Sequence, residues 1–148
     1  AYAIDACLVG SEMFIRDRIY CDPVVNLLQH LKAENGPVHD VHGIAHITGG
    51  GLSNLLRLHD SLGWHIDSPM PIPPEFVWLQ QNGNVTDLEM HRTFNMGLGM
   101  VLAVSKDASE GILNFLAAKN SGAQIIGHVH DGGHKVTHVN AEVMFQHY

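Results

Sequence analysis

Apolar residues recur along this chain at the spacings of helices and strands. Between residues 22 and 36 they fall at i, i+3, i+4 and i+7, the period of one helix face: Val24, Leu27, Leu28 and Leu31. Asp22 can cap this helix, and Pro23 suits its first position. Gly36 and Pro37 follow as stop signals. The pattern therefore predicts a helix that ends just before this Gly-Pro pair.

The next stretch predicts a strand, a glycine turn and a second helix. Residues 38–48 are mixed apolar and predict a strand, which runs into three consecutive glycines. The leucines of residues 52–62 predict a helix that Gly63 ends. Residues 64–67 predict a short strand after it.

Two short helices and a strand are predicted in the second half of the chain. The helices lie at residues 74–83 and within residues 84–95, where Thr86 and Glu89 have the spacing of a capping box. Residues 96–105 alternate strictly and predict a strand. One face of that strand is expected to carry the larger apolar residues: Met96, Leu98, Met100, Leu102 and Val104. The other face is expected to carry the smaller ones: Gly97, Gly99, Val101 and Ala103.

The C-terminal part predicts one more helix and a hairpin. Ser105 or Asp107 opens the helix, whose buried face is expected to hold four apolar residues: Ala108, Ile112, Phe115 and Leu116. Residues 123–130 and 134–140 flank an Asp-Gly-Gly turn, which predicts a β-hairpin, and residues 141–145 can extend the sheet. This order of elements predicts an α+β domain with helices packed on a mixed β-sheet.

Composition narrows the class of protein. The chain has 148 residues, the size of one domain, and 45% of them are hydrophobic. A net charge of −7 argues against binding to nucleic acid or to an anionic membrane surface. No apolar run approaches the ~20 residues that span a bilayer. Cys7 and Cys21 form no disulfide framework, and no signal peptide is recognised, so a cytoplasmic location is expected.

The segment after the predicted strand, Thr48-Gly49-Gly50-Gly51, is a candidate anion site. Bare glycine backbones let N–H groups approach an oxyanion, and a helix start adds positive potential. Phosphate is the expected guest, with Arg57 as a charge partner. The alternative is that the glycines only make a tight turn. The segment is not a P-loop, because it has no G-x-x-x-x-G-K-[ST] pattern.

A second polar group, Arg92, Thr93 and Asn95, stands where a predicted helix meets the alternating strand. These side chains could face a cleft, and Gly97 and Gly99 could let a ligand lie against the strand. The residues alone favour the alternative, in which Thr93 or Asn95 caps the helix and a helix packs over the glycines.

Twelve histidines raise the question of a metal. Five residues near the predicted hairpin could form a zinc cluster: His128, His130, Asp131, His134 and His138. A solvated hairpin is favoured, so no metal site is predicted. His42 and His46 share a strand face and could look toward the glycine loop, or could be ordinary buried histidines.

Two segments together, "VHGIAHITGGGLSNLLRL" and "GNVTDLEMHRTFNMGLGMVLAV", resemble the C-terminal domain of the phosphoribosylformylglycinamidine cyclo-ligase family, also called aminoimidazole ribonucleotide synthetases, in an archaeal-like form. The resemblance runs from about Arg18 to the C-terminus. It implies ATP-dependent closure of formylglycinamidine ribonucleotide to aminoimidazole ribonucleotide in purine biosynthesis.

The resemblance also implies roles for the two motifs. Residues 48–51, Thr48 with Gly49, Gly50 and Gly51, would hold the substrate's ribose phosphate. Residues 92–95, through Arg92, Thr93 and Asn95, would line the same cleft, and His42 and His46 are further cleft-lining candidates. ATP and Mg²⁺ are expected mainly on a preceding domain, and the full-length enzyme is expected to be a homodimer.

The chain departs from the family at its start. Residues 17–148 correspond to the substrate-phosphate-binding domain, whereas nothing here resembles the preceding ATP-binding domain. Residues 1–16 match nothing in the family and look divergent or artefactual, like a translated adaptor junction. A fragment of this kind is expected to be inactive alone. The alternative function is a non-catalytic module that binds a phosphorylated metabolite.

Overall fold

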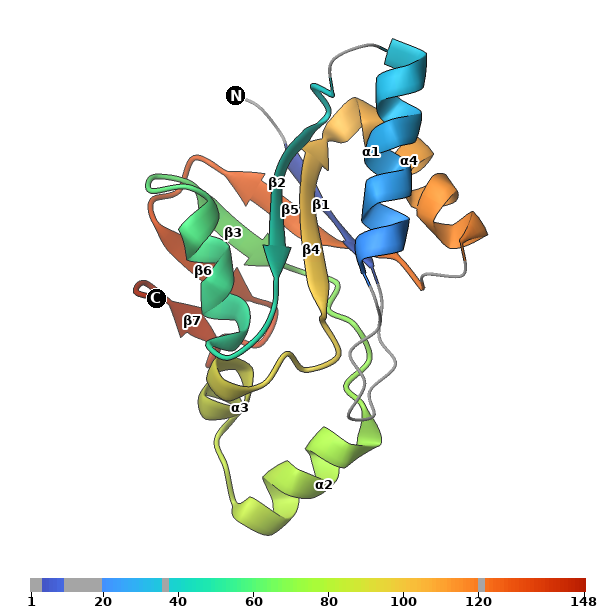
Figure 1. Cartoon of the computed structure of the whole chain (residues 1–148). Helices are drawn as coiled ribbons and strands as arrows, with labels where there is room; N and C mark the ends of the chain where they lie inside the picture. Colours follow the sequence, from blue (N-terminus) through green and yellow to red (C-terminus); the bar gives the residue numbers. More distant parts are fainter. Residues whose placement is uncertain (1–3, 10–19, 36–37, 120–121) are drawn as a thin grey trace.

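The protein folds around one mixed β-sheet, in agreement with the predicted α+β class (Figure 1). The computed structural model describes residues 4–9, 20–35, 38–119 and 122–148. Seven strands form the sheet: β1 (Ile4–Val9), β2 (Val41–His46), β3 (Gly63–Ile66), β4 (Met100–Ser105), β5 (Gln124–His130), β6 (Lys135–His138) and β7 (Met144–Phe145). Five helical segments accompany them: α1 (Cys21–Asn35), the 3₁₀ helix η1 (Gly51–Leu58), α2 (Pro74–Gly83), α3 (Asp87–Thr93) and α4 (Lys106–Ala118).

The strands lie in the order β2-β4-β1-β5-β3-β6-β7. Neighbours are antiparallel except β3 and β6, which run parallel. In the register, Trp64 of β3 lies opposite Val129 of β5 on one side and Val136 of β6 on the other. Strand β3 is therefore held between two strands that come more than fifty residues later in the chain.

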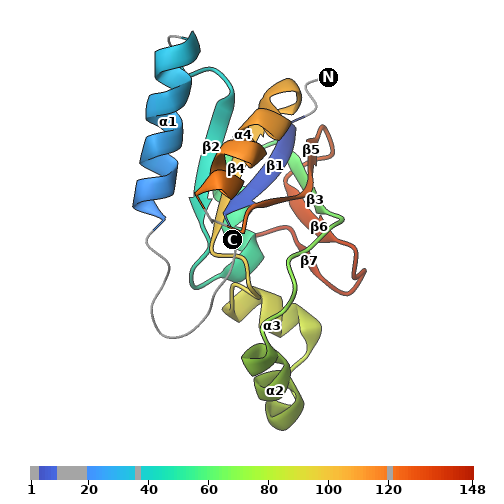
Figure 2. The same cartoon turned by 90° about the vertical axis from the view of Figure 1, so that its right-hand side faces the viewer.

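Helices α1 and α4 pack side by side on one face of the sheet (Figure 2). Their apolar stripes meet Leu102 and Val104 of β4 in one hydrophobic cluster. The stripe of α1 includes Leu27 and Leu31, and that of α4 includes the predicted Ile112 and Leu116. The periodicity-based predictions of these two helices are confirmed.

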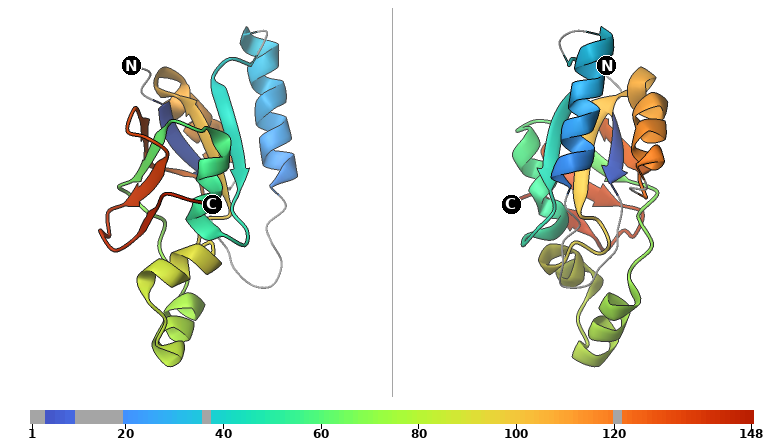
Figure 3. Two further views of the ribbon diagram at one scale, coloured as in Figure 1. Left: turned by 90° about the vertical axis from the view of Figure 1, so that its left-hand side faces the viewer. Right: turned by 45° about the vertical axis from the view of Figure 1, so that its right-hand side comes forward.

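The opposite face of the sheet is covered by η1, seen in Figure 3 beside β2. Leu52, Leu55 and Leu56 of η1 join Val101 and Ala103 in the larger hydrophobic cluster. Helices α2 and α3 extend away from the end of the sheet (Figure 1), where a smaller cluster joins them: Phe76, Met90 and Met96.

Two predicted boundaries need correction. The helix expected over residues 52–62 is a shorter 3₁₀ helix, which ends at Leu58 because His59 is extended. Its turns are tight from the start, since the Ser53 amide donates to the Gly50 carbonyl three residues back. Gly63 does not stop a helix but opens β3.

The strand expected over residues 96–105 begins only at Met100. Met96 and Gly97 have positive φ angles of 49° and 90°, which are incompatible with a strand. Leu98 therefore does not follow the alternation of side chains predicted for a strand. It packs in the same hydrophobic cluster as Val101 and Ala103, whereas the prediction placed it on the face of Leu102.

The predicted hairpin of residues 123–140 is wrong. Strands β5 and β6 follow each other in sequence, but β3 lies between them in the sheet. The Asp-Gly-Gly segment is thus a connection that crosses over β3. The predicted extension by residues 141–145 is confirmed, since β7 pairs with β6.

The N-terminal segment contributes a strand to the middle of the sheet. The backbone of Ile4–Val9 pairs with β4 on one side and β5 on the other. The remainder of the 1–16 segment that was predicted to be divergent lies outside the described residues. Within the described part of the chain, no helix is long and apolar enough to cross a membrane.

Candidate functional site

The glycine loop connects β2 to η1. Just before the loop, the Ile47 amide donates a hydrogen bond to the Gly99 carbonyl at 2.9 Å. The Gly51 amide then donates to the Thr48 carbonyl at 2.9 Å, which closes a turn. The Ser53 hydroxyl also donates to the Gly50 carbonyl, at 2.7 Å.

The three glycines meet different requirements. At Gly49 a Cβ would have no atom within 4 Å, and the residue is exposed. Gly50 has a φ of +97°, a conformation that favours glycine. Gly51 has a φ of +52°, and a Cβ there would overlap the backbone oxygen of His91. Gly51 is therefore needed where the loop presses against α3.

The side chain of Asn54 donates hydrogen bonds to the carbonyl groups of the glycine loop. This side chain is buried, and its Nδ2 lies 2.8 Å from the Gly51 carbonyl and 3.2 Å from the Gly49 carbonyl. The Thr48 carbonyl is 3.5 Å from the same nitrogen. Because the carbonyls turn inward to Asn54, the peptide units of the loop are fixed in orientation. Asn54 was not among the predicted site residues, although an amide side chain just after a glycine turn can bind the carbonyls of that turn.

Two amides of the loop remain available to a ligand. Among the described residues, none accepts a hydrogen bond from the amide of Gly49 or of Gly50. The amide of Gly51 is used within the turn. Of the predicted set, therefore, two glycine amides and the exposed Thr48 hydroxyl are free to meet an oxyanion.

Arg57 reaches the loop through Tyr148. Its Nη1 donates to the Tyr148 hydroxyl at 3.4 Å, and its guanidinium carbon lies 4.9 Å from the centre of that ring. A Cβ on Gly50 would lie 3.4 Å from the Tyr148 ring. The C-terminal tyrosine and the arginine therefore border the exposed side of the loop, a placement that no sequence signal gave for Tyr148.

The second motif lies against the glycine loop at the end of α3. A Cβ on Gly51 would overlap the backbone oxygen of His91 and would lie 2.9 Å from that of Phe94. Arg92 pairs with Glu89 at 3.7 Å and stands exposed, with its guanidinium 5.9 Å from the Phe145 ring. The two segments that carried the family resemblance are thus neighbours in space.

Thr93 and Asn95 have structural partners. The Thr93 hydroxyl donates to Glu89 at 3.1 Å, and the Asn95 Oδ1 accepts from the Gly97 amide at 3.1 Å. Protein atoms fill the space beside both glycines of this motif, with Pro71 against Gly97 and the Tyr20 ring against Gly99. A ligand lying on the strand at these glycines would therefore meet protein. The alternative is right that protein covers the glycines, but the covering residues lie outside the helices, and the C-terminal cap of α3 is Phe94, not Thr93 or Asn95.

His42 and His46 do not converge on the loop. The ring of His42 lies 2.8 Å from the Ser105 hydroxyl, at the end of β2 far from the glycines. The ring of His46 stands 5.9 Å from the ring of Tyr20, which packs with α1. Both rings are exposed.

His128 and His130 of β5 do not form a metal cluster with His138 of β6. His128 instead pairs with Asp67 at 3.1 Å and lies 5.3 Å from the ring of His65. The pKa of His130 is lowered, first by burial and then by the neighbouring His128. Across the described residues, no group of three or more His, Cys, Asp or Glu side chains could hold a metal ion.

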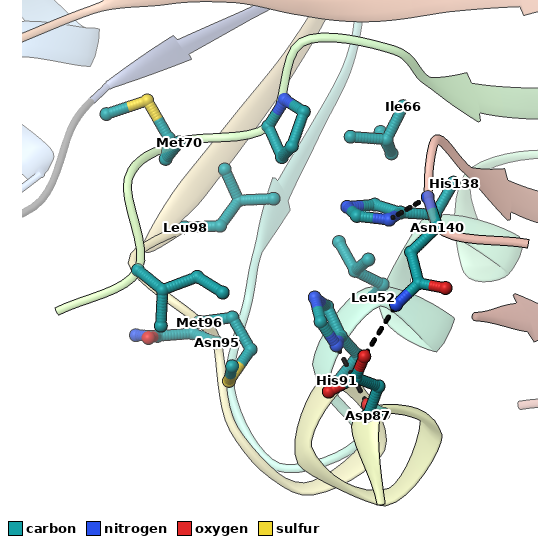
Figure 4. A pocket seen from close by; sticks show the side chains of 12 residues that line it. Leu52, Ile66, Met70, Asp87, His91, Asn95, Met96, Leu98, His138 and Asn140 are labelled. Carbon is teal, nitrogen blue, oxygen red and sulfur yellow. Dashed lines mark hydrogen bonds between the residues drawn. The ribbon is translucent and has the colours of Figure 1, made fainter. Parts of the chain in front are cut away.

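A pocket of about 200 Å³ lies between α3, η1 and β6 (Figure 4). Asn95 is the one residue of the predicted site that lines it. Two histidines from distant parts of the chain, His91 and His138, also line it, with their ring centres 5.0 Å apart. His91 was not predicted to have a role, and His138 belonged to the zinc cluster that was not favoured, because no local sequence pattern signals that these two rings meet.

The polar side of the pocket is held by α3. Asp87 accepts hydrogen bonds from the side chains of Asn140, at 2.6 Å, and of Gln80. The ring of His91 is buried and bonded to the Asp87 backbone oxygen at 2.8 Å. Burial, followed by the neighbouring His91, lowers the pKa of His138 to about 4, so its ring is neutral near pH 7.

Comparison with known proteins agrees with the motif resemblance. The family described as AIR synthase related protein, C-terminal domain, matches residues 16–140. The chain is 39% identical over 132 residues to the phosphoribosylformylglycinamidine cyclo-ligase of Methanopyrus kandleri, covering 89% of this chain and 36% of that relative. It is 41% identical over 123 residues to the Methanococcus vannielii protein of the same name, covering 83% and 33%. The chain thus spans about a third of the length of these relatives.

Solved structures share the fold at low sequence identity. E. coli HypE, a hydrogenase maturation protein, aligns with a TM-score of 0.65 and 18% identity, over 98% of this chain and 48% of that one. T. maritima PurL, solved with ADP, aligns with a TM-score of 0.58 and 12% identity, over 97% of this chain and 23% of that one.

Proposed function

Because the chain belongs to the AIR synthase related family, through its C-terminal domain, we propose that it works as the substrate-phosphate part of a phosphoribosylformylglycinamidine cyclo-ligase. The glycine loop carries this proposal. Its free Gly49 and Gly50 amides and the Thr48 hydroxyl would receive the ribose phosphate of formylglycinamidine ribonucleotide. Arg57, which contacts Tyr148 beside the loop, and the exposed Arg92 of the second motif would add positive potential.

Holding the phosphate would position the reacting end of the substrate elsewhere. In the proposed reaction, the amide oxygen accepts a phosphoryl group from ATP, an internal nitrogen attacks the activated carbon, and phosphate leaves as the ring closes. Such chemistry depends chiefly on placement and charge stabilisation. A rigid loop clamped by Asn54 suits the placement role.

The other components of the reaction are proposed to lie outside the described residues. As the resemblance to the cyclo-ligase family implies, we assign ATP and Mg²⁺ to a further part of the enzyme, which would work as a cytoplasmic homodimer. The alternative, a module that binds a phosphorylated metabolite without catalysis, rests on the same loop, and the family membership favours the enzyme.

Gly49 allows the sharpest test of the loop. A side chain fits there without contact, so Gly49→Ala and Gly49→Asp should both fold. The aspartate would place a negative charge beside the free amides and repel phosphate. We expect Gly49→Asp to lose binding of ribose 5-phosphate to this chain, measured by NMR titration, and Gly49→Ala to keep most of it.

The same pair of variants tests the enzyme. Joined to the ATP-binding part of a relative, the unmodified chain and Gly49→Ala should form ADP with formylglycinamidine ribonucleotide, and Gly49→Asp should not. Phosphate binding without any ADP formation would favour the non-catalytic module. Unchanged binding in Gly49→Asp would refute the loop assignment itself.

A further inference from the structure

The pocket lined by His91 and His138 contains hydrogen-bonding groups that have no role in the proposed function. Figure 4 shows both rings at one side of the pocket, each with one nitrogen bonded to the protein and the other directed into the open space. Among the described residues, neither of these Nε2 atoms has a hydrogen-bond partner. Two ring nitrogens therefore face the same space together.

The bonds behind the rings fix which nitrogen carries hydrogen. His91 Nδ1 lies 2.8 Å from the Asp87 backbone oxygen, which can only accept, so Nδ1 carries the hydrogen. The Nε2 of a neutral His91 is then an acceptor. His138 Nδ1 lies 3.0 Å from the Asn140 backbone nitrogen, which can only donate. The Nε2 of a neutral His138 therefore carries the hydrogen and is a donor.

The pocket thus presents one donor and one acceptor side by side, without a charge on His138. The lowered pKa of His138 keeps that ring neutral near pH 7, so His138 brings no positive charge to the pocket. Asp87, the nearest carboxylate, is already bonded to Asn140 and Gln80. An anionic group such as phosphate would gain little here, which separates this pocket from the glycine loop.

The remaining walls are largely apolar. They come from η1, β3 and the segments around α2 and α3: Leu52, Ile66, Pro69, Met70, Met96 and Leu98. The volume of about 200 Å³ is below the roughly 300–1,000 Å³ of pockets that bury whole drug-sized ligands. The space therefore suits one flat ring system, with any attached sugar left outside.

We propose that this pocket binds a neutral planar heterocycle that carries an acceptor nitrogen next to an amino group, as on the aminopyrimidine edge of adenine. His138 Nε2–H would donate to the ring nitrogen, and the amino group would donate to His91 Nε2. The apolar walls would cover the two faces of the ring. This site is distinct from the phosphate loop and does not depend on the function proposed for it.

Adenosine is the probe, because it has the ring edge and no phosphate. We expect millimolar adenosine to shift the histidine Nε2 signals of His91 and His138 in ¹H–¹⁵N spectra of the 148-residue chain. N6,N6-dimethyladenosine has no amino hydrogen and should bind at least about tenfold more weakly, the loss of one buried hydrogen bond. No shift with adenosine, or equal binding of the two nucleosides, would overturn the proposal.

Variants locate the site. His91→Phe and His138→Phe keep a flat ring but remove the acceptor or the donor, and each should weaken adenosine binding at least about tenfold. His39→Phe, at an exposed histidine that does not line the pocket, is the matched control and should leave binding unchanged. Circular dichroism shows which variants fold. Undiminished binding in a folded His91→Phe protein would place adenosine elsewhere and refute the site, and the nucleoside pair decides the matter if neither variant folds.

Discussion

At the scale of single residues, Gly51 is the most constrained position of the glycine loop. Its φ of +52° disfavours a side chain, and its contact with the His91 backbone leaves no room for one. We expect Gly51→Ala to lower the free energy of unfolding by about 2 kcal/mol or more, since a strained backbone and a steric overlap add. Urea denaturation followed by circular dichroism measures this loss.

Gly111 provides the control for that substitution. It lies within α4, and a Cβ there meets no atom within 4 Å. Gly111→Ala should raise stability by about 0.5–1 kcal/mol, the ordinary gain for alanine over glycine in a helix. Equal effects of the two substitutions would contradict the close approach of the loop to α3.

The role of a residue could be predicted from the sequence only where a local pattern indicated it. The run of glycines indicated a backbone conformation that favours glycine, and Gly50 and Gly51 do have positive φ angles. The clamp by Asn54 depends on carbonyls that turn inward only in the folded loop. The meeting of His91 and His138 depends on bringing α3 to the end of β6, which no periodicity reveals.

At the scale of elements, α3 carries residues of both the second motif and the pocket, so its N-terminus matters. The Thr86 side chain accepts from the Glu89 amide at 3.3 Å, as the capping-box spacing predicted. Thr86→Ala should cost about 1 kcal/mol of unfolding free energy, because that amide loses its acceptor. Thermal unfolding of Thr86→Ala beside Thr86→Ser, which keeps the hydroxyl, measures the cost. A Thr86→Ser protein as unstable as Thr86→Ala would argue against a capping role.

The elements show why local signals predicted helices better than strand pairing. The apolar periods of α1 and α4 directly describe the faces they bury. The Asp-Gly-Gly segment is a good local turn signal. However, β3, which precedes β5 by more than fifty residues in the sequence, lies between β5 and β6 in the sheet. Pairing of that kind is decided by how the whole sheet buries Trp64 and Ile66, not by the turn.

At the scale of the whole molecule, His138 couples stability to pH. Its pKa is about 4 in the folded protein and near 6.5 when unfolded, so the unfolded chain binds the proton first as pH falls. The contribution of His138 to the unfolding free energy is therefore fully present above about pH 6.5 and is lost as the pH falls from about 6.5 to 4. His130, whose pKa is also lowered, acts in the same direction.

The measurement is the urea midpoint of the chain at pH 7.5 and at pH 5. We expect a lower midpoint at pH 5, with His138 contributing on the order of 1 kcal/mol because its ring is only partly shielded from solvent. The His138→Phe variant should show a smaller difference between the two pH values. An identical difference in that variant would show that His138 does not titrate as described.

The place of β3 in the sheet also affects how this protein folds while it is being synthesised. Both neighbours of β3, β5 and β6, come after residue 123, so a nascent chain that has already emerged past α4 still has no strand that can pair with β3. Long-range pairing of this kind forms late, and the apolar surface that waits for it is prone to aggregate. Translation that stalls or stops between α4 and β5 should therefore yield insoluble product, whereas synthesis through β5, β6 and β7 lets the sheet close.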